Sequence, residues 1–202
     1  MRADRGPGVS LSQTAALGYL KIQVICLLVL ERNEAALVRL DAMLGMDPRH
    51  HYALASRAQL LVRMARQPEA ILATRYLVSI FRDDAAGWFN LGFLLDETGK
   101  LDEARSAFLR ACKLQPGLDR AWYGLGLVCI KQRRLDEAVA ALNRNVELQP
   151  LSPYGWYQLA RLHVERQDPE KARLIISRLK GFEPKVAARL ERETGLQGTQ
   201  PS

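Results

Sequence analysis

Cysteine and histidine are scarce in this chain of 202 residues, which has three of each. Cys26, Cys112 and Cys129 are an odd number without paired spacing, which argues against a disulfide framework. Neither a His-x-x-x-His nor a Cys-x-x-Cys spacing occurs, although zinc sites are typically built from such pairs. We therefore expect no metal, no cofactor, and reduced thiols in a cytoplasmic protein.

A long uninterrupted apolar segment is also missing. The run from Tyr19 to Leu30 carries Lys21 and Gln23, and it is shorter than the roughly 20 residues that a membrane-spanning helix needs. No A-x-A-like cleavage site follows it, which argues against a secretory signal. The sequence therefore predicts no membrane span.

Proline and glycine are not concentrated into a linker anywhere between residues 17 and 186, so we expect one domain. The composition, 48% hydrophobic and 25% charged, is ordinary for a folded protein. The formal net charge is +7, and residues 153–186 hold seven Lys or Arg against four Asp or Glu. Such an excess attracts acidic peptides or nucleic acid, but it is also common on solvated surfaces.

What the chain does have is repetition every 34 residues. Each copy contains a Trp, a Leu, a small residue, an Ala, a large apolar residue and a Pro at fixed offsets. These are Trp88, Leu91, Gly92, Ala104, Phe108 and Pro116, then Trp122, Leu125, Gly126, Ala138, Leu142 and Pro150, then Trp156, Leu159, Ala160, Ala172, Ile176 and Pro184. This period and this pattern resemble the tetratricopeptide repeat.

The resemblance implies an all-α fold, a right-handed α-solenoid of antiparallel helix hairpins with about five units and a C-terminal capping helix. We expect two degenerate units in residues 17–84 and three well-matched units in residues 85–186. Residues 187–202 complete the capping helix and its tail, and residues 1–16 are expected to be flexible. The tryptophans should fill buried space between helices. Packing explains Gly126, whereas Gly124 has no explanation in the repeat pattern.

Tetratricopeptide arrays bind peptides in a concave groove lined by the first helix of each repeat. The resemblance places aromatic and polar side chains on the groove positions, a combination that suits an extended peptide. The expected peptide-binding residues are Tyr52, Phe89, Asn90, Phe93, Arg120, Tyr123, Tyr154, Tyr157, Gln158 and Arg161. Some family members hold a C-terminal carboxylate with a clamp of five residues, of which Asn90 and Arg120 match only two.

The function that these patterns favour is a non-catalytic scaffold or adaptor for a protein or peptide partner. Cys129 and His163 share one position of successive repeats, but no Ser–His–acid or phosphate-binding pattern occurs, so we expect no enzyme. One alternative is binding of nucleic acid or an acidic partner by the basic last repeat. Its basic residues alternate with acidic ones, and we favour a protein partner. Another alternative is a docking or regulatory subunit of an enzyme or secretion assembly.

The first helix is apolar almost all round. Its expected groove-facing residues are Ile22, Ile25, Leu28 and Val29, and its packing residues are Leu20, Val24 and Leu27. An end repeat normally presents a polar face to water, so something must cover this stripe. Residues 1–16 hold too few apolar groups to do so. The pattern therefore predicts a homodimer through this helix.

Overall fold

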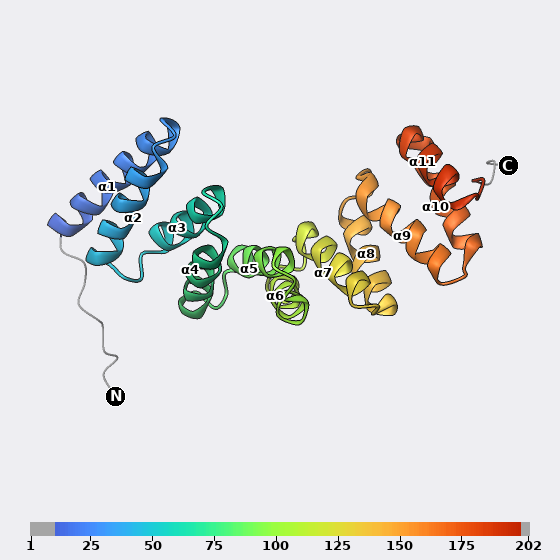
Figure 1. Cartoon of the computed structure of the whole chain (residues 1–202), viewed down its shortest axis with the longest axis horizontal. Helices are drawn as coiled ribbons and strands as arrows, with labels where there is room; N and C mark the ends of the chain where they lie inside the picture. Colours follow the sequence, from blue (N-terminus) through green and yellow to red (C-terminus); the bar gives the residue numbers. More distant parts are fainter. Residues whose placement is uncertain (1–10, 199–202) are drawn as a thin grey trace. The chain divides into compact units, whose positions relative to one another are not determined.

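The computed structural model describes residues 11–198, which form helices joined by short turns (Figure 1). The helices are α1 (Leu11–Val29), α2 (Asn33–Met46), α3 (His51–Arg63), α4 (Gln67–Ile80), α5 (Ala85–Glu97), α6 (Leu101–Leu114), α7 (Asp119–Lys131), α8 (Leu135–Leu148), α9 (Pro153–Glu165), α10 (Pro169–Phe182) and α11 (Pro184–Thr194). Consecutive helices pack in pairs, so the all-α array of hairpins is confirmed.

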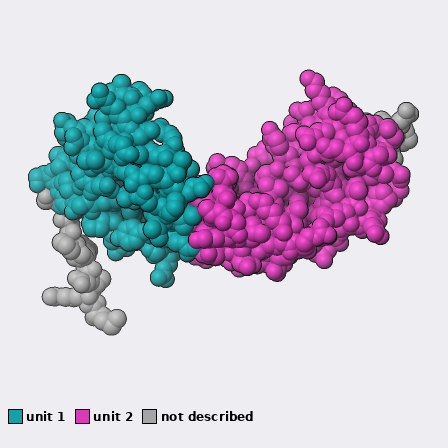
Figure 2. All heavy atoms as spheres, viewed as in Figure 1, with its two compact units in different colours: residues 1–83 teal, residues 84–202 magenta. Residues whose placement is uncertain are grey.

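The chain divides into two compact units, residues 1–83 and residues 84–202, where the sequence predicts one domain (Figure 2). Unit 1 contains the hairpins α1–α2 and α3–α4, which are the two degenerate repeats. Unit 2 contains the hairpins α5–α6, α7–α8 and α9–α10, followed by α11. The division falls in the turn after α4, where Arg82 replaces the proline that closes the other repeats.

Every hairpin turn uses one left-handed residue at the same repeat position. These residues are Glu31, Ala65, Gly99, Arg133 and Gln167, with φ between 55° and 74°. In each turn the next N–H donates to the carbonyl five residues earlier, at 2.8–2.9 Å. This is the hydrogen bond that satisfies the end of the first helix. Gly99 adopts this conformation without steric cost, whereas a side chain there costs about 1 kcal/mol.

Small residues let the helices of unit 2 approach closely. The ring of buried Phe108 on α6 lies between Gly92 on α5 and Gly124 on α7. A Cβ added at Gly92 would lie 2.8 Å from Phe108 Cδ1, and one added at Gly124 would lie 2.7 Å from Phe108 Cε1. The same relation joins Gly126 to Leu142, at 2.7 Å from Cγ. Gly124 is therefore small because the ring of the preceding hairpin packs on it.

The tryptophans, expected to be buried between helices, are half-buried. The indole N–H of Trp122 donates to the carbonyl oxygen of Pro116 at 2.9 Å, and that of Trp156 donates to Pro150 at 3.0 Å. Each of these two rings therefore lies over the turn that precedes its own helix. A side chain that both covers a turn and bonds to it remains partly in water.

Helix α1 begins at Leu11, so residues 11–16, expected to be flexible, form its first turns; residues 1–10 lie outside the described part. Gln13 Nε2 donates to the carbonyl oxygen of Met46 at 2.7 Å, which ties this end to α2. The helix has 19 residues, so the sequence argument from a shorter run does not hold. Among residues 11–198, α1 is long and apolar enough to cross a membrane by length and composition alone. The expected cytoplasmic localisation stays a prediction.

The array ends with α11, which packs on α10 and α9. A single residue, Glu183, separates α10 from α11, whereas four residues separate the end of each earlier hairpin from the start of the next. Helix α11 therefore starts three residues earlier than the repeat frame predicts. It ends at Thr194 and is followed by Gly195, which has a φ of 69°. The expected tail beyond residue 198 lies outside the described residues.

Replacing Gly124 with alanine should lower the free energy of unfolding by about 1–3 kcal/mol, because the new methyl group overpacks against Phe108. The ring has no room to move aside, since Gly92 lies against it from the other helix. Urea titration monitored by circular dichroism measures the change. Gly181→Ala is the matched control: Gly181 lies in α10 with open space around it, and alanine there should stabilise by about 0.5–1 kcal/mol. Equal effects of the two substitutions would contradict the packing.

Candidate functional site

The expected groove residues of unit 2 lie on the first helices α5, α7 and α9. On α5, the ring of Phe89 lies 5.9 Å from the ring of buried Phe108, centroid to centroid. The guanidinium of Arg120, from the start of α7, lies over Phe89 at 5.0 Å from its centroid. Phe89 therefore joins the core of the α5–α6 hairpin to the surface, and Arg120 covers its outer side.

Three tyrosines from two first helices meet around one hollow. Tyr123 of α7 and Tyr154 and Tyr157 of α9 line a cavity of about 240 Å³. Gln158 lines it as well, and α11 contributes Val186 and Arg189 in a wall that the repeat frame does not predict. Tyr123 and Tyr157 are half-buried, whereas Tyr154 is 69% exposed. This cavity offers aromatic faces with one amide and one guanidinium beside them.

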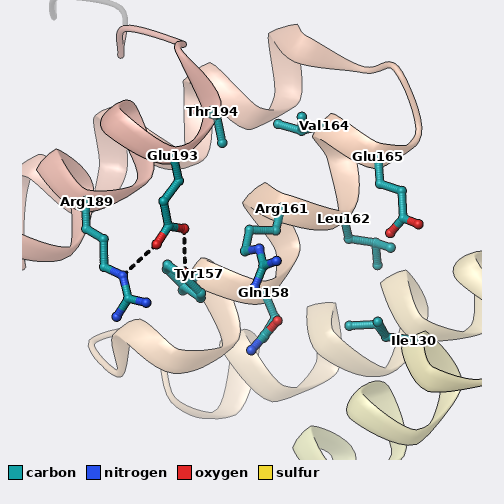
Figure 3. Close-up of a pocket in the computed structure, with 10 residues that line it drawn as sticks. All are labelled: Ile130, Tyr157, Gln158, Arg161, Leu162, Val164, Glu165, Arg189, Glu193 and Thr194. Atoms are coloured by element: carbon teal, nitrogen blue, oxygen red, sulfur yellow. Dashed lines mark hydrogen bonds and ion pairs between the residues drawn. The ribbon is translucent and has the colours of Figure 1, made fainter.

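A second cavity, of about 730 Å³, lies next to the first and shares three of its residues, Tyr157, Gln158 and Arg189. It is formed mainly by α9 and α11, with one contribution from α7 (Figure 3). Its lining is Ile130, Tyr157, Gln158, Arg161, Leu162, Val164, Glu165, Arg189, Glu193 and Thr194. The guanidinium of Arg161 lies over the ring of Tyr157, at 5.7 Å from its centroid.

Helix α11 is fastened to this surface by a charged network. The hydroxyl of Tyr157 donates to Glu193 Oε2 at 2.6 Å, and Arg189 Nε donates to Glu193 Oε1 at 2.7 Å (Figure 3). The hydrogen bond from Tyr157 holds the pKa of the Glu193 carboxyl below its usual value, and the same bond raises the pKa of Tyr157. Tyr157 thus stays a donor and Glu193 stays an anion near neutral pH.

Three of the expected peptide-binding residues, Asn90, Phe93 and Tyr52, lie outside the two cavities. Asn90 is half-buried and Phe93 is 47% exposed on α5, and neither lines the two cavities. Tyr52 belongs to unit 1, where the ammonium of Lys21 lies 4.6 Å from its ring centroid. Around the two adjoining cavities the structure therefore brings together five of the expected residues: Tyr123, Tyr154, Tyr157, Gln158 and Arg161.

Sequence reasoning missed the part that α11 plays in the site. Val186, Arg189 and Glu193 contact or line the surface, but their positions do not follow the 34-residue frame because α11 starts early. Pro184 indicates the early start of α11 in the sequence, since a proline is favoured at the first position of a helix.

The residues expected to form the N-terminal stripe differ in exposure. The exposed fractions are 61% for Ile22, 47% for Ile25 and 77% for Val29, while Leu28 is half-buried. On the opposite side, Val24 is fully buried.

The thiol and imidazole groups of unit 2 are enclosed. Cys112 and Cys129 are buried, and burial raises the pKa of Cys112 to about 12 and raises the pKa of Cys129 as well. Such thiols stay protonated and are poor nucleophiles. His163 is also buried, and its Nδ1 has no hydrogen-bond partner in the described part of the chain. Among residues 11–198, no three acidic, His or Cys residues come together as a metal site.

Packed helix pairs with an equivalent turn in every hairpin define a helical repeat protein. A sequence model described as the tetratricopeptide repeat matches residues 70–119 and 90–153. Residues 70–153 therefore match the tetratricopeptide repeat family.

Solved structures agree on the fold. A MamA segment from Desulfovibrio magneticus RS-1 is similar with a TM-score of 0.74 and 17% identity, covering 94% of this chain and 100% of that one. YrrB, described as a tetratricopeptide repeat protein with an unusual peptide-binding site, has a TM-score of 0.74 and 18% identity, covering 88% and 90%. PilF of Pseudomonas aeruginosa has a TM-score of 0.66 and 21% identity, covering 90% and 91%. A sequence search of curated proteins found no match.

Acid should destabilise the protein through His163. Burial lowers the pKa of this imidazole, and Asp168, whose Oδ2 lies 3.7 Å from Nδ1, only partly opposes that effect. The unfolded chain therefore binds a proton first, so stability present above about pH 6.5 is lost as pH falls, by at most about 1.4 kcal/mol per pH unit. Urea titrations at pH 7.5 and pH 5.5 measure the loss.

The variant His163→Leu has no imidazole to protonate, so it should lose less stability over this range. Leu95 fills the same repeat position in α5, which is why leucine is the chosen replacement. His51→Gln, at an exposed site in unit 1, is the control and should keep the wild-type dependence. An unchanged pH dependence in His163→Leu would show that another group is responsible.

Proposed function

We propose that this chain is a non-catalytic scaffold that binds an extended segment of a partner protein along the first helices of unit 2. The observation that carries the proposal is the convergence of Tyr123, Tyr154 and Tyr157 on one hollow beside Gln158. Aromatic side chains provide apolar contact at low entropic cost, and the amide side chain pairs with a peptide backbone. YrrB, which has a similar fold, is described as having a peptide-binding site, and this supports the proposal.

The charges of the last repeat favour a protein over nucleic acid. Four of its seven basic residues form ion pairs with neighbouring carboxylates. The pairs are Arg166 with Asp136, Lys171 with Asp168, Arg173 with Glu170, and Lys180 with Glu191. A phosphate backbone needs free cations, and these four are engaged.

Tyr123→Ala and Tyr154→Ala should each weaken partner binding by about tenfold or more, as expected for aromatic residues at an interface centre. The partner is first isolated from native cells with the wild-type chain, and its dissociation constant is then measured with purified proteins. Tyr76→Ala, which removes a tyrosine that is 49% exposed on α4, is the matched control and should bind normally.

Thermal unfolding of Tyr154→Ala should match the wild type, because this ring is largely exposed. A steep loss of affinity with salt would indicate phosphate contacts and a nucleic-acid partner. Normal binding by both tyrosine variants would refute the proposed surface.

We also propose that the exposed face of α1 contacts a second copy of the chain. The one charged residue of α1, Lys21, lies over the ring of Tyr52, so the exposed stripe of Ile22, Ile25 and Val29 carries no charge of its own. Two identical apolar stripes are self-complementary in a twofold dimer.

Sedimentation velocity tests the dimer. The wild-type chain should sediment as a dimer at micromolar concentration and Ile25→Asp as a monomer, because a buried carboxylate at the interface is unpaired. Leu72→Asp, at a site 68% exposed on α4, is the control and should remain dimeric. A wild-type monomer that partitions into phospholipid vesicles would instead assign the stripe of α1 to a bilayer.

A further inference from the structure

The arginines of unit 2 differ in what they contact, and the difference bears on what the surface binds. Seven of them form ion pairs with carboxylates. These are Arg105, Arg133, Arg134, Arg144, Arg166, Arg173 and Arg189. Arg120 and Arg161, which lie on groove positions of the first helices, pair with no carboxylate in residues 11–198 and instead cover the rings of Phe89 and Tyr157.

A guanidinium that covers a ring keeps its hydrogen-bonding capacity. Its five N–H donors point outward from its edge, whereas the ring contacts its face. The ring also restricts the arginine side chain, so less conformational entropy is lost when a ligand binds. Arg120 and Arg161 are therefore oriented donors, suited to a carboxylate that accepts two parallel hydrogen bonds.

The lining of the larger cavity contains two carboxylates of its own. Its own two carboxylates are both engaged: Glu165 pairs with Arg133, and Glu193 accepts from Tyr157 and Arg189. Arg161 forms no direct ion pair with either of them, although its charge attracts the Glu193 carboxylate from a longer distance. One helical turn before it, Gln158 lies beside Arg161 in the same cavity and adds an amide donor (Figure 3).

We propose that the cavity between α9 and α11 receives a carboxylate of the bound peptide and that Arg161, assisted by Gln158, holds it. The partner segment is thus acidic, and Arg120 meets a second acidic residue elsewhere on the same surface. This inference rests on the proposed function and specifies the ligand. The site differs from the five-residue clamp considered above, because it is formed by the last repeat and α11.

A library of random short peptides displayed on phage, selected on the full chain, tests the ligand chemistry. Peptides that the wild type selects should be enriched in Asp and Glu beside apolar residues. In fluorescence anisotropy with a selected peptide, Arg161→Gln should raise the dissociation constant about tenfold, the loss of one charge-assisted pair. Arg178→Gln is the matched control: Arg178 also covers a ring, that of Trp156 at 4.4 Å, but it lies on α10, and its loss should change affinity less than about twofold.

Amidation of the critical acidic residue of the peptide identifies the pair. It should weaken binding to the wild type about as much as Arg161→Gln does, and it should add little when that substitution is already present. Additive losses, or selected peptides without acidic residues, would overturn the carboxylate site while leaving groove binding intact.

Two other outcomes separate this inference from the proposed function. If no peptide is selected, or if Tyr154→Ala binds the selected peptide normally, the peptide-binding function itself fails. If a single-stranded oligonucleotide binds as tightly and loses affinity equally in Arg161→Gln and Arg178→Gln, the cations act only through diffuse charge, and the carboxylate site is refuted.

Discussion

The contact of Phe108 with Gly92 and Gly124 determines how the first half of unit 2 is arranged. A ring projecting from α6 fits between α5 and α7 only because both helices present a glycine to it. The same ring contacts Phe89, whose outer side is covered by Arg120. A packing requirement in the interior therefore positions a cation and an aromatic side chain on the surface. The position of these surface side chains therefore depends on the packing of the core.

Charge is distributed in a corresponding way. The ion pairs of unit 2 lie largely between neighbouring repeats or along the second helices, for example Arg105 with Glu137 and Arg173 with Glu170. Exposed pairs of this kind contribute at most about 1 kcal/mol each. On the first helices, Arg120 and Arg161 take part in no such pair and cover aromatic rings instead. Net charge alone, +7 for the whole chain, does not reveal this.

The 34-residue period was sufficient to predict the hairpins, because the tryptophan, the small residues and the proline keep a single register through residues 85–186. The convergence of Tyr123 and Tyr157 also follows from that register. The role of Gly124 could not be predicted, because it depends on a ring from the neighbouring hairpin. The contribution of Arg189 and Glu193 was missed for a different reason, since a one-residue link shifts α11 out of the frame.

The five hairpin turns are geometrically equivalent but chemically unequal. Four of them force a side chain into the left-handed region, and the α5–α6 turn alone has a glycine there. In a linear array, folding starts where one hairpin forms most readily and spreads to its neighbours. The α5–α6 hairpin also contains Phe108, which α7 needs for its own packing. We therefore expect folding of unit 2 to begin at its N-terminal hairpin and to proceed toward α11, so that the candidate binding surface is completed last.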